Sequence, residues 1–254
     1  MNSHLYKCIN KTKGRTFGIA HVGAHIGQEI PIYEKFEIKP ILLFEPQLNV
    51  FNILRDKFSE RKNIYFYNFG LGSNSTKKKL YKADSNLGAS SSILKPLLHK
   101  EIHEEITFSE TEEINIFRYD EIKVEKINFL VMDIQGFELE ALKGFGKKLE
   151  EIEFIYTEVN RDFLYEENVI YTELDAFLKK NGFTRVSTRW DSRVPYGDAF
   201  YMRNTNLSNV FQYFNNIKNN FLETSIYFML LKIFDLKKNY VLLKKIIKKI
   251  ILRK

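Results

Sequence analysis

The sequence predicts an α/β fold built on a doubly wound, mostly parallel sheet. Short apolar runs of strand length alternate along the chain with stretches in which apolar residues recur about once per helical turn. Hydrophobic residues make up 44% of the 254 residues, which is enough to bury a core. Too few residues separate the last two apolar runs for a helical crossover, so we expect these two strands to pair antiparallel.

The first part of the chain shows this alternation clearly. Residues 15–22 (RTFGIAHV) form an apolar run that ends in a glycine-containing turn. Ile30, Tyr33 and Phe36 then follow at a spacing that predicts a helix. Further strands are expected at residues 40–45 and 63–69, with a helix at 49–58 between them.

Residues 73–119 interrupt the alternation, and we interpret them as an insertion over one end of the sheet, where substrate-contacting loops are common. The insertion contains a lysine-rich hairpin candidate at 77–82, a serine turn at 90–92 and a probable strand at 113–119. Regular structure resumes with strands at 127–134 and 152–159, helices at 138–143 and 173–181, and the final strands at 183–190 and 198–203.

The net charge of +7 belongs to one end of the chain. Residues 205–254 carry ten Lys and Arg but only two acidic residues, whereas the first 204 residues carry 29 basic and 30 acidic side chains. We therefore expect a domain at 1–204 and a basic, amphipathic helical tail at 205–254. Because the domain itself is not basic, we expect no nucleic-acid partner.

The tail ends in VLLKKIIKKIILRK, where Leu and Ile would share one helix face and Lys the other. It has no uncharged run of the ~18–20 residues that span a bilayer. It could contact an anionic membrane surface, join two copies in a homodimer, or pack on the domain. The lone Cys8 and the polar first fourteen residues predict a cytoplasmic protein without a signal peptide, which could associate with the inner membrane face.

The turn after the first strand is typical of a nucleotide site, because helix N-terminal amides point at the ligand there. Gly23 and Gly27 lack the three-glycine pattern of a pyrophosphate cradle, and His25 stands between them. Glu45 ends the second strand, where a carboxylate can accept hydrogen bonds from a ribose diol. The pattern favours a nucleoside without a phosphate chain, such as S-adenosylmethionine; a packing turn followed by a surface glutamate is the alternative.

Several motifs follow one another in a recognisable order. They are HVGAHIGQE at 21–29, FEP at 44–46, LG at 71–72, SSS at 90–92, MDIQGFE at 132–138, ALKG at 141–144, YTEVN at 156–160 and GDAFY at 197–201. Over roughly residues 17–203 the series resembles the FkbM family of S-adenosylmethionine-dependent methyltransferases. The resemblance implies a Rossmann-like methyltransferase fold, with a seven-stranded sheet whose last strand runs antiparallel. It also implies methyl transfer to an oxygen, often a hydroxyl of a sugar, glycan or similar small acceptor.

The expected cofactor-binding residues follow from the first turn and from the ends of the central strands. They are His21, Gly23, Ala24, His25, Gly27, Glu45, Asn68 and Asp133. The family often has an aspartate where His21 stands, so the resemblance implies that an acidic contact near the methionine part of the cofactor is missing here. Asn68 lies where adenine contacts are expected, although it could instead order a loop.

Methyl transfer to a hydroxyl requires the acceptor to be aligned with the donor and to lose a proton. Carboxylates at the ends of neighbouring central strands meet at one rim, which makes Asp133 and Glu158 the first catalytic candidates. Glu138 and Asp198 are further candidates, with a helix-stabilising acid and a turn-forming aspartate as their respective alternatives.

Other functions and ligands stay open at this point. A divalent metal is compatible with these carboxylates, but their spacing does not require one, so no metal site is assigned. His99 and His103 are expected on a solvated helix face rather than around zinc. An inactive glycan-binding module and a sugar-nucleotide or nicotinamide enzyme are the alternative functions.

Overall fold

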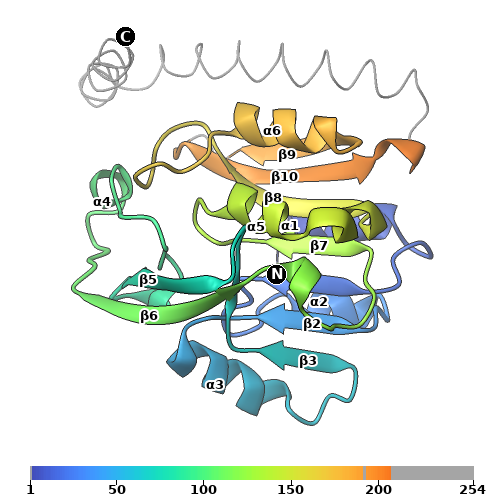
Figure 1. The fold of residues 1–254 in the computed structure, drawn as a ribbon, viewed down its shortest axis with the longest axis horizontal. Helices are drawn as coiled ribbons and strands as arrows, with labels where there is room; N and C mark the ends of the chain where they lie inside the picture. The colour runs from blue at the N-terminus through green and yellow to red at the C-terminus, as the bar shows by residue number, and fades with distance from the viewer. Residues whose placement is uncertain (1, 191–192, 207–254) are drawn as a thin grey trace. The chain divides into compact units, whose positions relative to one another are not determined.

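The computed structural model describes residues 2–190 and 193–206, so the tail predicted at 205–254 lies outside the described residues except for its first two. Seven strands form the central sheet in the order β3-β2-β1-β7-β8-β10-β9 (Figure 1). Their bounds are Ile19–Val22 (β1), Ile41–Phe44 (β2), Ile64–Tyr67 (β3), Phe129–Met132 (β7), Phe154–Asn160 (β8), Phe183–Trp190 (β9) and Tyr196–Arg203 (β10).

The direction of the strands confirms the predicted fold class. Neighbouring strands from β3 through β8 pair parallel, whereas β10 pairs antiparallel with both β8 and β9. The sheet is therefore mostly parallel, with a reversed final strand. The first strand begins at Ile19, later than the apolar run from residue 15 suggests.

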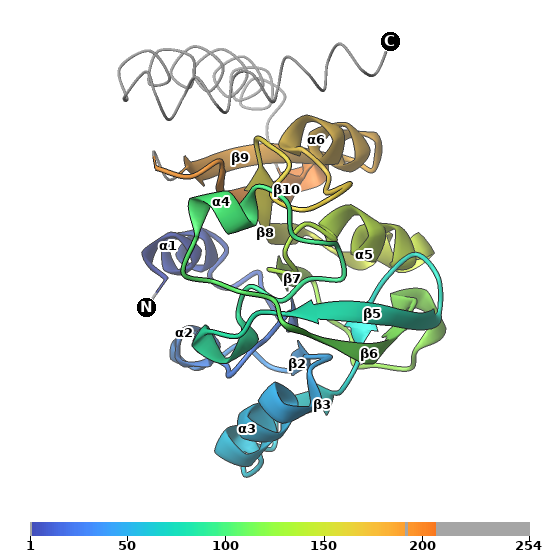
Figure 2. The same ribbon diagram turned by 90° about the vertical axis from the view of Figure 1, so that its left-hand side faces the viewer.

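The central strands are buried on both faces, which explains why they read as continuous apolar runs rather than as alternating patterns. Every residue of β1, β2, β7 and β8 is buried. Helices α1 (Ser3–Lys11), α2 (Ile30–Lys35) and α3 (Leu48–Phe58) contribute to the apolar cluster on one face. Helices α5 (Glu138–Gly144) and α6 (Tyr171–Lys180) contribute to the cluster on the other, and Figure 2 shows α1 and α5 on opposite sides of the sheet.

Helix α1 is an element that the sequence reading misses. It is amphipathic, and Leu5, Cys8 and Ile9 are buried against the sheet. Asn2 caps its N-terminus, because the Asn2 side-chain oxygen accepts the Leu5 amide at 3.0 Å. The polar composition of the first residues conceals this short apolar face.

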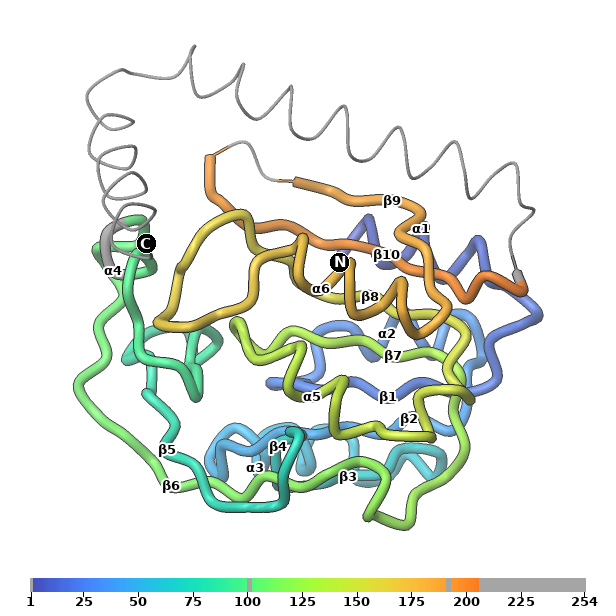
Figure 3. Tube along the Cα trace, turned by 45° about the horizontal axis from the view of Figure 1, so that its top comes forward, coloured from blue at the N-terminus to red at the C-terminus, as the bar shows by residue number. Residues whose placement is uncertain are grey.

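The insertion forms a second, three-stranded sheet in the order β4-β6-β5. Strand β4 (Gly70–Leu71) lies just before the insertion, which contributes β5 (Thr76–Lys82), the short helices η1 (Asn86–Gly88) and α4 (His99–Ile102), and β6 (Glu110–Phe117). The lysine-rich segment is thus one strand, whose antiparallel partner β6 lies beyond α4. The chain between β5 and β6 lies at the carboxyl ends of the parallel strands, beside the loop after β8 (Figure 3).

Candidate active site

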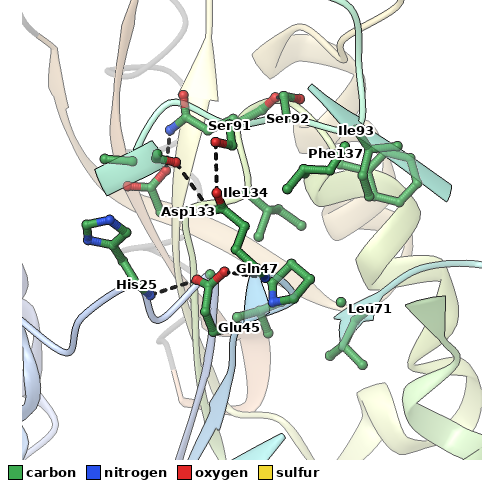
Figure 4. Close-up of a pocket in the computed structure, with 18 residues that line it drawn as sticks. His25, Glu45, Gln47, Leu71, Ser91, Ser92, Ile93, Asp133, Ile134 and Phe137 are labelled. Atoms are coloured by element: carbon green, nitrogen blue, oxygen red, sulfur yellow. Dashed lines mark hydrogen bonds between the residues drawn. The ribbon is translucent and has the colours of Figure 1, made fainter. Parts of the chain in front are cut away.

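A pocket opens at the carboxyl ends of β1, β2 and β7, with part of the insertion on its far side (Figure 4). Its empty space amounts to about 570 Å³, including the part open to solvent. Gly23, His25, Glu45 and Asp133 line it, as the sequence analysis expected of cofactor contacts. The other lining residues are Val22, Pro46, Gln47, Gly70, Leu71, Leu80, Gly88, Ala89, Ser91, Ser92, Ile93, Ile134, Gln135 and Phe137.

Glu45 joins the turn after β1 to the segment after β2. Its two carboxylate oxygens accept the backbone amides of His25 at 3.0 Å and Gln47 at 2.9 Å (Figure 4). Burial raises the pKa of the Glu45 carboxyl to about 7, although these two amides favour the charged form. The carboxylate therefore points toward the glycine bend, and each oxygen retains a lone pair for a further donor.

The two glycines of the bend are required by packing within the protein. Gly23 has a φ of +81°, and a Cβ atom there would lie 2.1 Å from the backbone oxygen of Asp133. At Gly27, with a φ of +76°, a Cβ would meet the side chains of Ile30, Leu54 and Phe58. The bend thus brings the end of β1 close to the end of β7 at Gly23, and it anchors the start of α2 at Gly27.

Residues 85–92, which we call the roof segment, cover the side of the pocket formed by the turns after β1 and β2. The His25 ring contacts the Leu87 carbonyl at 3.1 Å, and the Gln47 amide donates to the Gly88 carbonyl at 3.3 Å. The Ser91 hydroxyl donates to the Gln47 side-chain oxygen at 3.0 Å (Figure 4). These contacts hold the insertion against the turns that follow β1 and β2.

Asp133 lies on the opposite wall, immediately after β7. Its side chain is exposed to the pocket. Desolvation by the residues around it raises the pKa of its carboxyl. The Gln135 amide donates to one Asp133 oxygen at 2.7 Å, and the Tyr165 hydroxyl donates to the Gln135 side-chain oxygen at 2.8 Å. Gln135 has a φ of +56°, so this turn is unusual for a residue with a side chain.

The other carboxyl candidates lie behind or beside Asp133. Glu138 is buried, and one of its oxygens accepts the backbone amides of Ile134 at 3.1 Å and Gly136 at 3.2 Å. Burial raises the pKa of Glu138 to about 7. Its hydrogen bonds show that this side chain holds the turn after β7.

Glu158 and Asp198 face each other across strands β8 and β10. Burial and the neighbouring carboxylates raise the pKa of Glu158 well above its ordinary value. Burial and the charge of Asp133 raise the pKa of Asp198 to about 6. Asp198 lies within β10 rather than at its start, so a turn-forming role does not describe it. Glu29, at the start of α2, adds another carboxyl near Asp133, and its pKa is raised chiefly by burial.

The remaining expected cofactor contacts are placed outside the pocket lining. His21 is buried under α2, where its Nδ1 lies 3.0 Å from the Tyr33 hydroxyl, and burial lowers its pKa to about 3. Ala24 is fully buried. The Asn68 amide donates to the carbonyls of Glu45 at 3.0 Å and Pro46 at 3.1 Å, so it orders the chain after β2.

Sequence reasoning missed several residues that shape the site. Gln47 holds the roof segment through Gly88 and Ser91, and Gln135 holds Asp133. Gln135 stands inside a motif that the sequence analysis quoted, which was a usable signal. Tyr165 comes from the loop after β8, and no local pattern marks it. His99 is also buried rather than solvated, and its ring packs 5.3 Å from that of Tyr165, between ring centroids.

Two further observations concern ligands and location. Nowhere in the described part of the chain do three His, Cys, Asp or Glu side chains gather in a way that could hold a metal ion. Within residues 2–190 and 193–206, every helix is too short or too polar to cross a lipid bilayer.

Comparison with known proteins gives a family and a fold. The family model described as "Methyltransferase FkbM domain" matches residues 21–185, more than half of the chain. No curated protein matches the sequence. Among solved structures, an FkbM methyltransferase from Methylobacillus flagellatus KT is 15% identical, with a TM-score of 0.50. The match covers 74% of this chain but only 43% of that protein's length.

A second solved structure is similar over nearly its whole length. It is a candidate tRNA (m1A22) methyltransferase from Streptococcus pneumoniae, with 13% identity, a TM-score of 0.50 and coverage of 97% of this chain and 96% of that one. At such low identity these likenesses show the fold alone, which is the Rossmann-like fold of methyltransferases.

Proposed function

The chain belongs to the FkbM methyltransferase family, and from that premise we propose that it transfers a methyl group from S-adenosylmethionine to a hydroxyl of a sugar, glycan or similar small acceptor. The observation that carries this proposal is the placement of Glu45, whose buried carboxylate spans the glycine bend and the end of β2 in the wall of the pocket. A carboxylate in this position is suited to the hydroxyl groups of a ribose.

The charge of the pocket supports a nucleoside that carries sulfur in place of phosphates. Glu45 and Asp133 line it, and among the described lining residues none is Lys or Arg. The bend lacks the three-glycine pattern of a pyrophosphate cradle, whereas a positively charged sulfonium is favoured beside carboxylates. The missing cradle argues against a nicotinamide cofactor or a sugar nucleotide, and the lack of Lys and Arg among the described lining residues argues against a nucleic-acid acceptor.

The side chains present fit S-adenosylmethionine. When bound, this cofactor supplies an electrophilic methyl group on a sulfonium. Glu45 would accept hydrogen bonds from the ribose hydroxyls through its remaining lone pairs. Asp133 would place negative charge beside the cationic end, and the roof segment would exclude water from the nucleoside side.

The acceptor hydroxyl must lose its proton as the new bond forms, and we propose that Asp133 or Asp198 accepts it. Glu138 is occupied by two backbone amides of its own turn. The raised pKa of Glu158 favours its neutral form, which can donate but not accept a proton. Asp198, with a pKa of about 6, is mostly ionised at neutral pH and retains useful basicity.

Calorimetry with S-adenosylhomocysteine tests the proposed cofactor. The unsubstituted chain is expected to bind it and not to bind NAD. Replacing Glu45 by Ala should weaken binding by about 100-fold, because charge-assisted hydrogen bonds to the ribose are lost. The matched control is Glu113→Ala on the exposed surface of β6, which should bind like the unsubstituted chain. A folded sample that releases no heat with S-adenosylhomocysteine would refute the proposal.

The acceptor is tested separately, by incubating the protein with radiolabelled S-adenosylmethionine and a panel of glycans and small polyols. Label is expected on a hydroxyl oxygen. Glycan binding without any labelled product would favour the inactive binding module instead.

The sequence of the tail supports a second, independent proposal about location. Its basic amphipathic pattern suits a cytoplasmic protein that associates peripherally with an anionic membrane. Truncation after Arg203 should abolish flotation with anionic vesicles while S-adenosylhomocysteine still binds. If truncation instead changes only the oligomeric state in ultracentrifugation, the tail is a dimer contact.

A further inference from the structure

We propose that Tyr165 is a positioning residue that orients the Asp133 carboxylate through Gln135. Its role in methyl transfer rests on the proposed function, because Asp133 matters to the reaction only if the pocket holds the methyl donor. The observation behind it is a continuous line of hydrogen bonds from a distant loop into the pocket wall.

The two contacts of the Gln135 side chain fix its orientation. Its nitrogen donates to an Asp133 oxygen at 2.7 Å, and its oxygen accepts the Tyr165 hydroxyl at 2.8 Å. The Gln135 backbone carbonyl also accepts the Ser92 hydroxyl at 2.8 Å. Gln135 thus links the Tyr165 hydroxyl to a carboxylate that lines the pocket, so the orientation of Asp133 depends on where the phenol lies.

The phenol is held firmly enough to act in this way. Tyr165 is fully buried, and its backbone amide donates to the Asn168 side chain at 2.9 Å. The adjoining backbone pairs with the insertion, since the Leu97 amide donates to the Leu164 carbonyl and the Glu166 amide to the Lys95 carbonyl. The insertion and the loop after β8 therefore set the position of the hydroxyl together.

The loop after β8 also packs tightly against the turn after β7 that contains Gln135. A Cβ atom on Gly136 would lie 2.7 Å from the Cβ of Asn168 and 3.6 Å from the ring of Tyr165. This close approach places the phenol against Gln135. Burial raises the pKa of the Tyr165 hydroxyl, so it stays protonated and can donate throughout the working pH range.

The hydroxyl has a second acceptor, the Ser90 carbonyl of the roof segment at 3.0 Å. A phenol carries one hydrogen, so the two acceptors share it. The same group that orients Asp133 therefore also holds the roof segment, through its contact with the Ser90 carbonyl. Loss of the hydroxyl frees the Gln135 amide to rotate and leaves Asp133 without a fixed donor.

The test is a double-substitution cycle of Tyr165→Phe and Gln135→Ala in the full chain. Tyr165→Phe retains the ring and removes only the hydroxyl. We expect it to weaken S-adenosylmethionine binding about 5- to 10-fold in calorimetry, and to have no further effect once Gln135 is Ala. An equal loss in both backgrounds would overturn the proposal, because Tyr165 would then act independently of Gln135.

A second readout needs no cofactor. The Gln135 hydrogen bond lowers the pKa of Asp133, so Tyr165→Phe should raise that pKa in a carbon NMR titration of the carboxyl groups. An unchanged titration would overturn the proposal even if the cofactor binds. Failure of the unsubstituted chain to bind S-adenosylmethionine, with the titration shifted as expected, would overturn the proposed function while supporting the positioning role.

Tyr201→Phe is the matched control. Tyr201 is also buried, and its hydroxyl donates to Asp175 at 2.8 Å, a contact between β10 and α6. Its loss should lower the thermal midpoint about as much as Tyr165→Phe does. It should leave both the cofactor affinity and the Asp133 titration unchanged, and a shift in either would mean that the effects report general destabilisation.

Discussion

The two walls of the pocket are held in different ways. On the β1–β2 side, Glu45 is fixed by backbone amides from the turns that follow two adjacent strands. On the β7 side, Asp133 is fixed by a side chain that depends on Tyr165, which lies 32 residues further along the chain and is itself held by the insertion. We call the wall that contains Glu45, where we propose that the nucleoside binds, the nucleoside wall, and the wall that contains Asp133 the reactive wall. The nucleoside wall is built from local backbone geometry, whereas the reactive wall depends on distant loops.

The contrast separates contacts made by backbone amides from contacts made by side chains. The amides that hold Glu45 belong to the backbone, so they persist when neighbouring side chains change, provided that Gly23 and Gly27 stay glycine. The reactive wall, by contrast, can be changed by altering one loop. Substitutions can test this contrast, and the most sensitive point is the contact between Gly23 and the Asp133 backbone.

Replacing Gly23 by Ala should have the largest effect, because it forces the two walls apart. The new Cβ would lie 2.1 Å from the Asp133 backbone oxygen, and Gly23 has a φ of +81°. We expect a loss of at least about 3 kcal/mol in the free energy of unfolding, measured by urea denaturation. Gly14 is the control: its φ is +78° but nothing lies within 4 Å of the added atom, so Gly14→Ala should cost only about 1 kcal/mol. Equal losses for Gly23→Ala and Gly14→Ala would show that Gly23 is not in close contact with the Asp133 backbone.

The pH dependence of stability should depend on Glu45. Its pKa is about 7 in the folded chain and about 4.5 in the unfolded chain, so folding takes up a proton between these values. The stabilisation is complete below pH 4.5 and is lost as the pH rises through 7, by roughly 2–3 kcal/mol. Glu45→Gln cannot titrate, so this part of the decline should be missing from its denaturation curves recorded from pH 4 to 8, while Glu138 and Asp198, whose pKa values are also raised, keep the remainder. The same substitution at exposed Glu113 should follow the unsubstituted chain, and a similar flattening there would contradict the assignment to Glu45.

The reactive wall should distinguish the charged methyl donor from its neutral product. As the pH rises from 5 to 8, Asp198 ionises and adds negative charge beside Asp133. The affinity for S-adenosylmethionine relative to S-adenosylhomocysteine should therefore rise about tenfold over this range in calorimetry. Asp198→Asn should remove most of the rise. A ratio that does not change with pH would mean that the sulfonium lies away from these carboxylates.

The smallest effect is expected at Asn68, on the nucleoside wall. Its amide holds two carbonyls of the chain after β2, so Asn68→Ala should lower the free energy of unfolding by about 1 kcal/mol. The affinity for S-adenosylhomocysteine should fall only about two- to threefold, because the Glu45 contacts remain. A much larger loss of affinity with unchanged stability would show instead that Asn68 contacts adenine.

The family motifs and the alternation of apolar runs predicted most of the fold and several of the residues that line the pocket. They located every strand of the central sheet and the reversed final strand, and they placed Glu45, Asp133 and the glycine bend at one edge. They did not reveal α1, whose apolar face is only three residues wide. They also grouped His21 with the cofactor contacts, although the structure buries it beneath α2.

The apolar runs alone place the carboxyl end of each central parallel strand to within two residues. In a parallel sheet that is sufficient to bring Glu45 and Asp133 to the same rim, because all strand ends lie at one edge. The strand pattern does not predict what holds the Asp133 side chain in place, because Gln135 is itself held by a distant loop. Ser90 lies 75 residues before Tyr165, and its carbonyl shares the Tyr165 hydroxyl hydrogen with the Gln135 side chain because two loops meet there. No local sequence pattern predicts the path of a loop, because that path is set by packing against the rest of the fold.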